Sequence, residues 1–98
     1  MKHRFYRVES FEIVGPYILD VRFDDEKTVR INFEPVLHGG LYGPLRDLSV
    51  FDQVKIDPEV KTLVWPNGAD FNPSTLHDWE ENSEAMRKQA EKWELIAA

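Results

Sequence analysis

Apolar and polar residues alternate along two stretches in the first third of the chain. In residues 17–23 and 29–33 every second position is apolar, namely Tyr17, Leu19, Val21, Phe23, Val29, Ile31 and Phe33. Successive side chains of a β-strand point to opposite faces, so a period of two is typical of a strand with one buried face. Both stretches are therefore predicted to be half-buried strands.

A third strand is predicted before these two, although its alternation is imperfect. Residues 5–13 are rich in aromatic and β-branched side chains, but Glu9 and Glu12 fall on opposite faces of an ideal strand. The Gly-Pro pair at 15–16 and the DDEK segment at 24–27 predict turns. Three strands joined by short connections favour an antiparallel meander with one face in water.

The middle of the chain has no regular period. Residues 34–47 hold three of the five glycines and two of the six prolines, which is typical of a loop with room for one helical turn. Asp47 is predicted to cap a short helix that ends at about Gln53. Residues 54–56 and 61–65 flank an Asp-Pro turn and predict a second, shorter hairpin.

The segment TLVWPNGADFNPSTL, at 62–76, predicts a corner between a strand and a helix. Pro66 has no backbone N–H and cannot continue a central strand, and the Asn-Gly pair at 67–68 tolerates the positive φ of a chain reversal. Asn72 lies where a helix N-cap belongs, and Pro73 suits the first helical position. Burial and chain reversal explain these residues before any chemistry is invoked.

An apolar stripe with one polar gap follows this corner at alternating steps of three and four residues. It comprises Leu76, Trp79, Ser83, Met86, Ala90, Trp93 and Ala97. The spacing predicts an amphipathic helix. A continuous helix over residues 73–96 would be about 36 Å long at 1.5 Å per residue. The alternative is a break in EENS, with Asn82 capping a second helix that folds back over the sheet.

Together these patterns predict an α+β fold. It consists of an antiparallel three-stranded meander, a second short hairpin, a short middle helix, and a C-terminal helix or helix pair packed on the sheet. The 98 residues are enough for a single core and too few for a catalytic domain with a separate cofactor domain.

The net charge narrows the range of partners. Twelve Lys and Arg against eighteen Asp and Glu give a formal net charge of -6. Such a field repels polyphosphates, so direct binding of nucleic acid is not expected. The chain has no cysteine, and with it no disulfide framework and no thiolate nucleophile.

No targeting or membrane segment is expected. Residues 1–10 contain no continuous apolar run, and no stretch approaches the roughly 20 apolar residues of a membrane span. We therefore expect a cytoplasmic protein that does not bind membranes.

Residues suited to catalysis are sparse. The histidines are His3, His38 and His77, and no G-x-S-x-G motif accompanies them. The His77-Asp78 pair is similar to the His-Asp pair of metal phosphohydrolases, but those sites need further ligands, so the pair is expected on a solvated helix face. HGGLYGPL at 38–45 fits neither a P-loop nor a dinucleotide fingerprint. We predict no catalytic residue, no cofactor and no metal site, and therefore no enzyme.

Six residues are candidates for contact with a partner or ligand, namely Tyr42, Arg46, Trp65, Asn67, Asp70 and Trp93. Trp is enriched at interface hot spots, and for Trp93 both a partner contact and core packing stay open. The polar side chains of Asn67 and Asp70 are expected to hydrogen-bond their own turn. The guanidinium of Arg46 suits either a carboxylate at the corner or a partner.

The chain resembles a known family in the segments GPLRD at 43–47 and FDQVKIDPEVKTLVWPNGADFNPSTL at 51–76. With the preceding strand pair, these are similar to the small bacterial domain-of-unknown-function family 2442, whose hallmark W-P-N-G-A-D matches residues 65–70. The resemblance covers roughly residues 5–80. It implies an α+β core over 1–80, with 81–98 as a helical extension of the same compact domain.

The resemblance implies little about mechanism, because the family's members lack an established activity. Some look like one half of a toxin–antitoxin pair, and others carry the domain ahead of a helix-turn-helix. No further helix follows Ala98, so operator binding by this chain alone is not expected.

Two functions fit these observations. One is a protein-interaction module, antitoxin-like or regulatory, with a small basic protein as partner and the C-terminal helix as a contact or homodimer surface. The alternative is a small-ligand binder or weak enzyme with a pocket between the glycine-rich loop and the corner, lined by Tyr42, Trp65 and Arg46.

Overall fold

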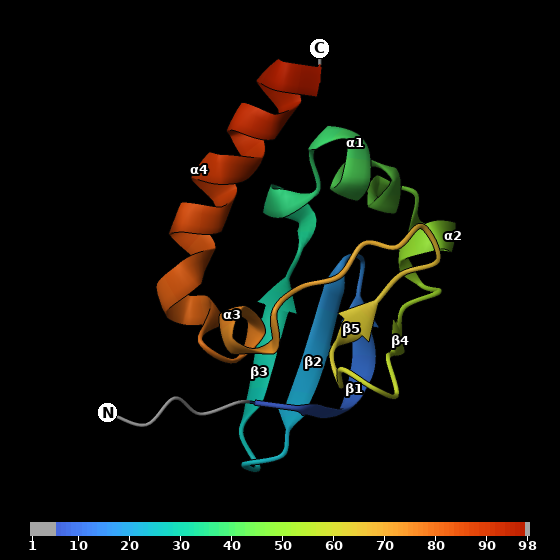
Figure 1. Ribbon diagram of the computed structural model, residues 1–98, viewed down its shortest axis with the longest axis vertical. Coiled ribbons are helices and arrows are strands. Elements are labelled where there is room, and N and C mark those ends of the chain that lie inside the picture. Colours follow the sequence, from blue (N-terminus) through green and yellow to red (C-terminus); the bar gives the residue numbers. More distant parts are fainter. Residues whose placement is uncertain (1–5, 98) are drawn as a thin grey trace.

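The main sheet consists of three antiparallel strands in the order β1-β2-β3 (Figure 1). They are β1 (Val8–Gly15), β2 (Ile18–Phe23) and β3 (Thr28–Asn32). The structure is a computed structural model that describes residues 6–97, with side chains described for residues 6–92. The predicted meander is confirmed.

A β-bulge accounts for the imperfect alternation of β1. Val8 pairs with Phe23 and Phe11 pairs with Val21, so three steps along β1 match two steps along β2. The extra residue brings both Val8 and Phe11 to the face that packs on the core. The strand is therefore present although its sequence does not keep a period of two.

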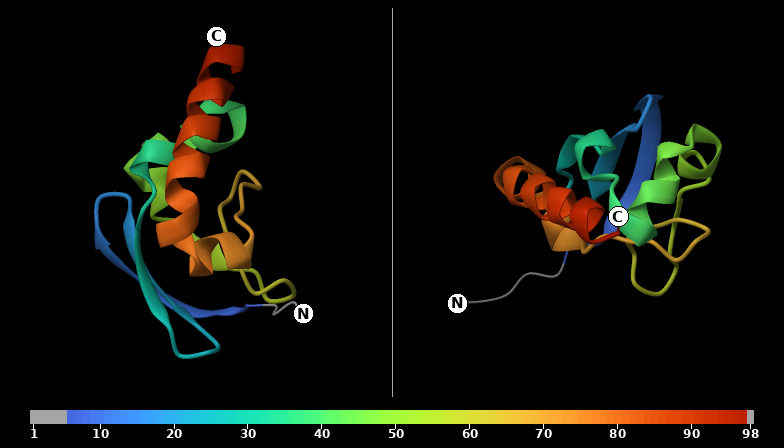
Figure 2. Two further views of the ribbon diagram at one scale, coloured as in Figure 1. Left: turned by 90° about the vertical axis from the view of Figure 1, so that its left-hand side faces the viewer. Right: turned by 90° about the horizontal axis from the view of Figure 1, so that it is seen from above.

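The two faces of the sheet differ as the alternation predicts. Four side chains on the inner face of β2 and β3 have no exposed surface, namely Leu19, Val21, Phe23 and Ile31. On the outer face the Arg30 guanidinium donates two hydrogen bonds to the Asp20 carboxylate, at 2.7 and 3.0 Å. The helices cover the inner face of the sheet (Figure 2).

The middle of the chain is more regular than its sequence predicts. It forms η1 (Glu34–Val36), α1 (Gly39–Tyr42), η2 (Gly43–Arg46) and α2 (Leu48–Phe51). The first three of these segments contradict the expected loop with one helical turn over 34–47, whereas α2 is the predicted short middle helix. Pro35 and Pro44 lie at the starts of two 3-10 turns, where a missing N–H costs nothing, and Gly39 has a φ of 82°.

The predicted cap of the middle helix is confirmed. The Asp47 carboxylate accepts a hydrogen bond from the backbone N–H of Ser49 at 3.0 Å and so satisfies an otherwise unpaired donor at the start of α2.

The second hairpin and the corner after it also form as predicted. The hairpin consists of β4 (Lys55–Ile56) and β5 (Leu63–Val64). The chain then reverses, because the N–H of Trp65 donates to the carbonyl of Ala69 at 2.9 Å and Gly68 has a φ of 89°.

The C-terminal part forms two helices, α3 (Pro73–His77) and α4 (Trp79–Ala97). Asn72 caps α3, as predicted, by accepting from the N–H of Ser74 at 2.8 Å. Asp78 leaves the helical conformation, with φ of -104° and ψ of 36°. Both predicted alternatives are wrong on this point, because the break lies at Asp78 and Asn82 is inside α4. The short Asp78 side chain bonds its neighbour His77, a local contact that competes with helix continuation.

Aromatic side chains fill the space between the sheet and the helices. Phe33 lies 5.8 Å from Trp65, 5.3 Å from Phe71 and 5.6 Å from Trp79, measured between ring centroids. The apolar stripe of α4 is buried at Trp79 and Ala90. The main helix contacts of α4 are with η1 and α1, and its C-terminal end extends beyond them (Figure 1).

Within residues 6–97, no helix combines the length and the apolar composition needed to cross a membrane.

Candidate functional site

Trp65, the central residue of the predicted site, lies in the core. It is 1% exposed, and its indole N–H donates to the backbone carbonyl of Phe51 at 2.9 Å. A buried indole with its only polar group satisfied leaves no surface for a ligand. The structure gives Trp65 a packing role.

Tyr42, Asn67 and Asp70 come together, but the side chains of Tyr42 and Asn67 bond to backbone groups, and Asp70 takes part through its backbone carbonyl while its side chain is exposed. The Tyr42 hydroxyl donates to the Asp70 carbonyl at 2.7 Å, and its ring stacks on Phe71 at 4.8 Å. The Asn67 amide donates to the carbonyl of Leu41 at 2.8 Å and its oxygen accepts from the Ala69 N–H at 3.1 Å. Together these bonds fasten the corner to α1.

Burial of the Tyr42 ring raises the pKa of its hydroxyl, and the nearby Asp70 carboxylate raises it further. The hydroxyl therefore stays protonated and donates to the corner throughout the neutral range.

The other two predicted residues are Arg46 and Trp93. Arg46 is exposed, with a guanidinium nitrogen 3.3 Å from Nδ1 of His38, and its carbonyl accepts from the Tyr17 hydroxyl. Trp93 lies on α4, beyond the side chains that the structure describes.

His77 is the least expected feature of the described chain. Its side chain is 7% exposed, which contradicts the predicted solvated helix face. The imidazole stacks on Tyr6, with ring centroids 3.6 Å apart, and meets Phe23 edge-on at 5.0 Å. The break after α3 turns this ring inward, against the β2–β3 hairpin.

Both ring nitrogens of His77 face carboxylates. Nε2 lies 2.7 Å from Oδ2 of Asp25, and Nδ1 lies 2.8 Å from Oδ1 of Asp78. A neutral imidazole has one N–H, so only the doubly protonated ring can donate to both carboxylates at once. Lys27 completes the group by donating to the His77 carbonyl at 3.0 Å.

We call these four residues, Asp25, Lys27, His77 and Asp78, the His77 clasp. Two of them belong to the turn between β2 and β3 and two to the end of α3, so the clasp ties the hairpin to the helices. In the described part of the chain, no group of three or more His, Asp or Glu side chains has the arrangement needed to hold a metal ion.

Beside the clasp, the outer edge of β3 carries backbone groups that point away from the sheet. The N–H of Phe23 donates to the Lys27 carbonyl and the N–H of Phe33 donates to the Tyr17 carbonyl, so residues 27 and 33 face β2. Backbone direction alternates along a strand, and Thr28, Arg30 and Asn32 therefore face outward. The N–H and C=O groups of these three residues pair with no other backbone group among the described residues.

A concavity of about 430 Å³ lies between this edge and the helices. A second, of about 240 Å³, continues it along α4, and Trp79 and Ser83 line both. We call the two together the β3–α4 groove. Its walls are Lys27, Thr28, Val29, Arg30, Asn32, Pro35 and Val36 on one side and His77, Trp79, Glu80, Ser83, Glu84 and Arg87 on the other.

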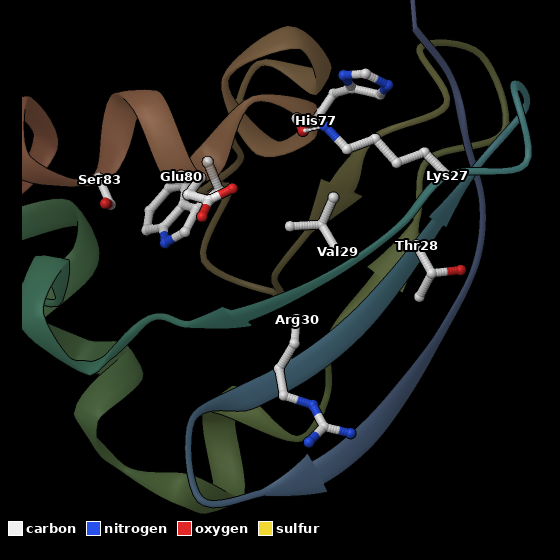
Figure 3. A pocket seen from close by; sticks show the side chains of 8 residues that line it. Lys27, Thr28, Val29, Arg30, His77, Glu80 and Ser83 are labelled. Carbon is white, nitrogen blue, oxygen red and sulfur yellow. Dashed lines mark hydrogen bonds between the residues drawn. The ribbon is translucent and has the colours of Figure 1, made fainter.

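Figure 3 shows the larger part of the groove from close by. Val29 points from β3 toward the helices, whereas Thr28 and Arg30 point to the opposite side of the strand. Ser83 and Glu80 face the strand from α4. Val29 and Trp79 are the apolar residues that line this part of the groove, and the other lining residues are polar.

The cations of the groove are already paired. Arg30 bonds Asp20, and this bond lowers the pKa of the Asp20 carboxyl. Arg87 donates to Glu84 at 2.6 Å and to Glu91 at 2.8 Å, and the former bond lowers the pKa of the Glu84 carboxyl.

Glu80 differs from these residues, because its carboxylate makes no ion pair with any described residue. The free charge of the groove is therefore negative.

A third concavity, of about 390 Å³, lies between β1 and the second hairpin, lined by Arg7, Val8, Glu9, Asp24, Ile56 and Lys61. None of the three concavities is lined by Tyr42, Trp65 or Arg46.

Sequence reasoning missed both the clasp and the groove. Asp25 and Lys27 are residues of a turn in sequence, and their distance of about fifty positions from His77 hides the contact. One signal was available: His77 follows the buried Leu76 and precedes the buried Trp79, so a bend at Asp78 would bury all three.

Fold and site together define a small α+β domain whose meander is covered by helices on one face and bears an outward-facing edge strand beside a groove. The model of the family described as protein of unknown function (DUF2442) matches residues 8–82, and the chain belongs to this family. The match confirms the resemblance indicated by W-P-N-G-A-D and ends inside α4. No curated protein and no solved structure matches the chain.

Proposed function

We propose that this chain is a protein-interaction module that positions or neutralises a small basic partner protein, in the manner of an antitoxin. The observation that carries the proposal is the outward-facing edge of β3 beside the β3–α4 groove. Proteins generally cover or charge such edges, because free N–H and C=O groups pair readily with another chain. An edge that adjoins an apolar groove is suited to specific docking.

The charge of the chain supports a basic partner. A net charge of -6 attracts cationic surfaces over a distance and raises the rate of encounter. Within the groove, Glu80 supplies an anionic group without an ion pair among the described residues, so the long-range field and the local charge have the same sign.

The experiment is coexpression of the chain with the product of the neighbouring reading frame, followed by affinity purification of the complex. Ser83→Trp places an indole in the groove, and Gln89→Trp places the same side chain on an exposed position of the same helix as a matched control. We expect the partner to copurify with the natural chain and with Gln89→Trp, and to be lost with Ser83→Trp.

Circular dichroism and thermal unfolding of both variants establish that each is folded before it is scored. Copurification that is unaffected by Ser83→Trp would contradict docking at the groove. The absence of any complex with the natural chain would contradict the antitoxin-like role.

A further inference from the structure

The occupant of the β3–α4 groove follows from its shape and charge, on the basis of the proposed function. We infer that the groove takes an extended segment of the partner protein. This segment adds to the main sheet as a fourth strand beside β3, places an apolar side chain over Val29 and Trp79, and places a Lys or Arg side chain against Glu80.

The backbone of β3 supports strand addition. The strand presents the N–H and C=O groups of Thr28, Arg30 and Asn32 at regular intervals along one edge. An added strand satisfies such groups with its own backbone, and the alternate side chains then fall into the groove. The sequence of the segment is read only at every second residue, because side chains alternate.

The apolar lining of the groove supports an apolar side chain. A cavity of about 150 Å³ holds a benzene ring, and the larger part of the groove, which Val29 and Trp79 line, measures about 430 Å³. One or two large apolar side chains of the segment therefore fit, and their burial contributes about 1.5 to 3 kcal/mol each when complete.

The charges of the groove support a cationic residue. Arg30 and Arg87 are held by the carboxylates of their own neighbours, and Lys27 is held by the carbonyl of His77. Glu80 makes no ion pair among the described residues. A Lys or Arg of the partner gains an ion pair at Glu80 without displacing an existing one.

Other occupants fit these observations less well. A docked helix satisfies its own backbone groups and leaves the edge of β3 without partners. A second copy of this chain brings another net charge of -6 and a second Glu80 to the same place. An extended cationic segment satisfies the edge, the apolar lining and the charge together.

The experiment starts from a displayed library of random ten-residue peptides, selected on the full chain and counter-selected on Ser83→Trp. Each backbone N–H of an enriched peptide is then methylated in turn, and affinity is measured by fluorescence anisotropy. We expect losses of tenfold or more at every second residue, with the intervening positions changing less than threefold, because only alternate N–H groups of an added strand face β3.

Variants of the chain test the same geometry from the other side. Arg30→Pro removes one outward N–H, and proline is tolerated on an edge strand where that group faces solvent. Arg30→Ala keeps the N–H and removes the same guanidinium. We expect Arg30→Pro to weaken the peptide tenfold or more and Arg30→Ala less than threefold. Glu80→Gln should weaken peptides that carry Lys or Arg several-fold, and less at high salt.

Several results would overturn the inference. Losses at all methylated positions would indicate a bound helix, and no loss at any position would exclude backbone pairing. Dimerisation of the chain that is abolished by Arg30→Pro would assign the edge to a second copy. If Arg30→Pro does not fold, the methylation pattern measured with the natural chain still tells whether the peptide pairs with β3 as a strand.

The failure of this inference is separable from that of the proposed function. A complex with the neighbouring gene product that is lost with Ser83→Trp but not with Arg30→Pro would retain the interaction module and reject strand addition. If that complex is absent but the selected peptides show the alternating methylation pattern, strand addition is retained and the antitoxin-like role is rejected.

Discussion

The Trp65 corner and the β3–α4 groove differ in how completely their polar groups are satisfied. In the corner, the indole of Trp65, the amide of Asn67 and the hydroxyl of Tyr42 each bond a backbone carbonyl of the same chain. Along the groove, the outward backbone groups of Thr28 and Arg30 have no backbone partner among the described residues. The corner is a closed structural element, and the groove is a surface with remaining capacity to bond.

This difference bears on the use of sequence motifs. W-P-N-G-A-D is the most specific segment of the chain because a tight reversal restricts which residues can stand at each position. A docking edge restricts residue type far less, since backbone groups do the bonding. A motif in which every residue type is restricted therefore reflects the requirements of the fold, whereas a binding edge is hard to recognise in a single sequence.

The largest expected effect is on the corner. Trp65→Ala removes a fully packed indole and the hydrogen bond from its N–H to the Phe51 carbonyl, so we expect a loss of about 3 to 5 kcal/mol in the free energy of unfolding. Urea denaturation followed by circular dichroism measures it. A loss below about 1 kcal/mol would mean that the corner is not part of the core.

The His77 clasp gives the next largest effect. His77→Phe keeps an aromatic ring against Tyr6 but leaves the carboxylates of Asp25 and Asp78 without their shared donor. We expect a loss of about 1 to 3 kcal/mol, because the polar contacts between the imidazole and the two carboxylates are removed. Adding Asp25→Asn to His77→Phe should recover part of the lost stability. If the effects of the two substitutions are strictly additive, His77 and Asp25 are not energetically coupled.

Asn67→Ala sharpens the comparison of the two regions. The side chain bridges Leu41 and Ala69, so its removal should lower stability by about 1 kcal/mol. The complex with the partner protein should keep its affinity within a factor of two, as measured by titration calorimetry below the unfolding temperature. A complex lost in a folded Asn67→Ala variant would give the corner a binding role.

Acid should weaken the fold by a smaller amount, and one contributor, Asp57, lies outside the groove. The backbone N–H groups of Val60 and Glu59 hold the pKa of Asp57 below its ordinary value of 3.8. A carboxyl with a lowered folded-state pKa contributes stability above its unfolded pKa and loses it as pH falls through the folded one. The urea midpoint should therefore fall below about pH 4.

Asp57→Asn should lower the midpoint at neutral pH and reduce its slope below pH 4. An unchanged slope would assign the acid sensitivity to other carboxyl groups whose pKa values are lowered in the fold, namely Asp20, Asp47 and Glu84.

The sequence predicts an element of the fold correctly where that element depends on residues close together in the chain. The alternation in 17–23, the cap at Asp47 and the Asn72-Pro73 start of α3 all depend on residues within four positions, and each is confirmed. The helix break combines a local and a distant contact. Asp78 bonds its neighbour His77, and His77 also meets Asp25 across the fold, a contact that no pattern along the C-terminal stretch contains.

The candidate site was harder to predict for the same reason. Five of the six predicted residues were selected as polar or aromatic groups near glycines, and Trp93 was selected from the helical stripe. The structure gives the side chains of Tyr42, Trp65 and Asn67 internal partners. The groove arises where an edge strand runs beside α4, so it depends on the tertiary arrangement. The half-buried Val29, on a strand whose other inner residue, Ile31, is fully buried, lies at the groove.

Hydrogen exchange of backbone amides, measured by NMR on the free chain and on its complex with the neighbouring gene product, tests the contrast between edge and corner most directly. In the free chain the amides of Thr28 and Arg30 should exchange rapidly and that of Trp65 slowly, and in the complex Thr28 and Arg30 should become protected at least tenfold. Protection of the Thr28 and Arg30 amides in the free chain, or no change on complex formation, would contradict the account.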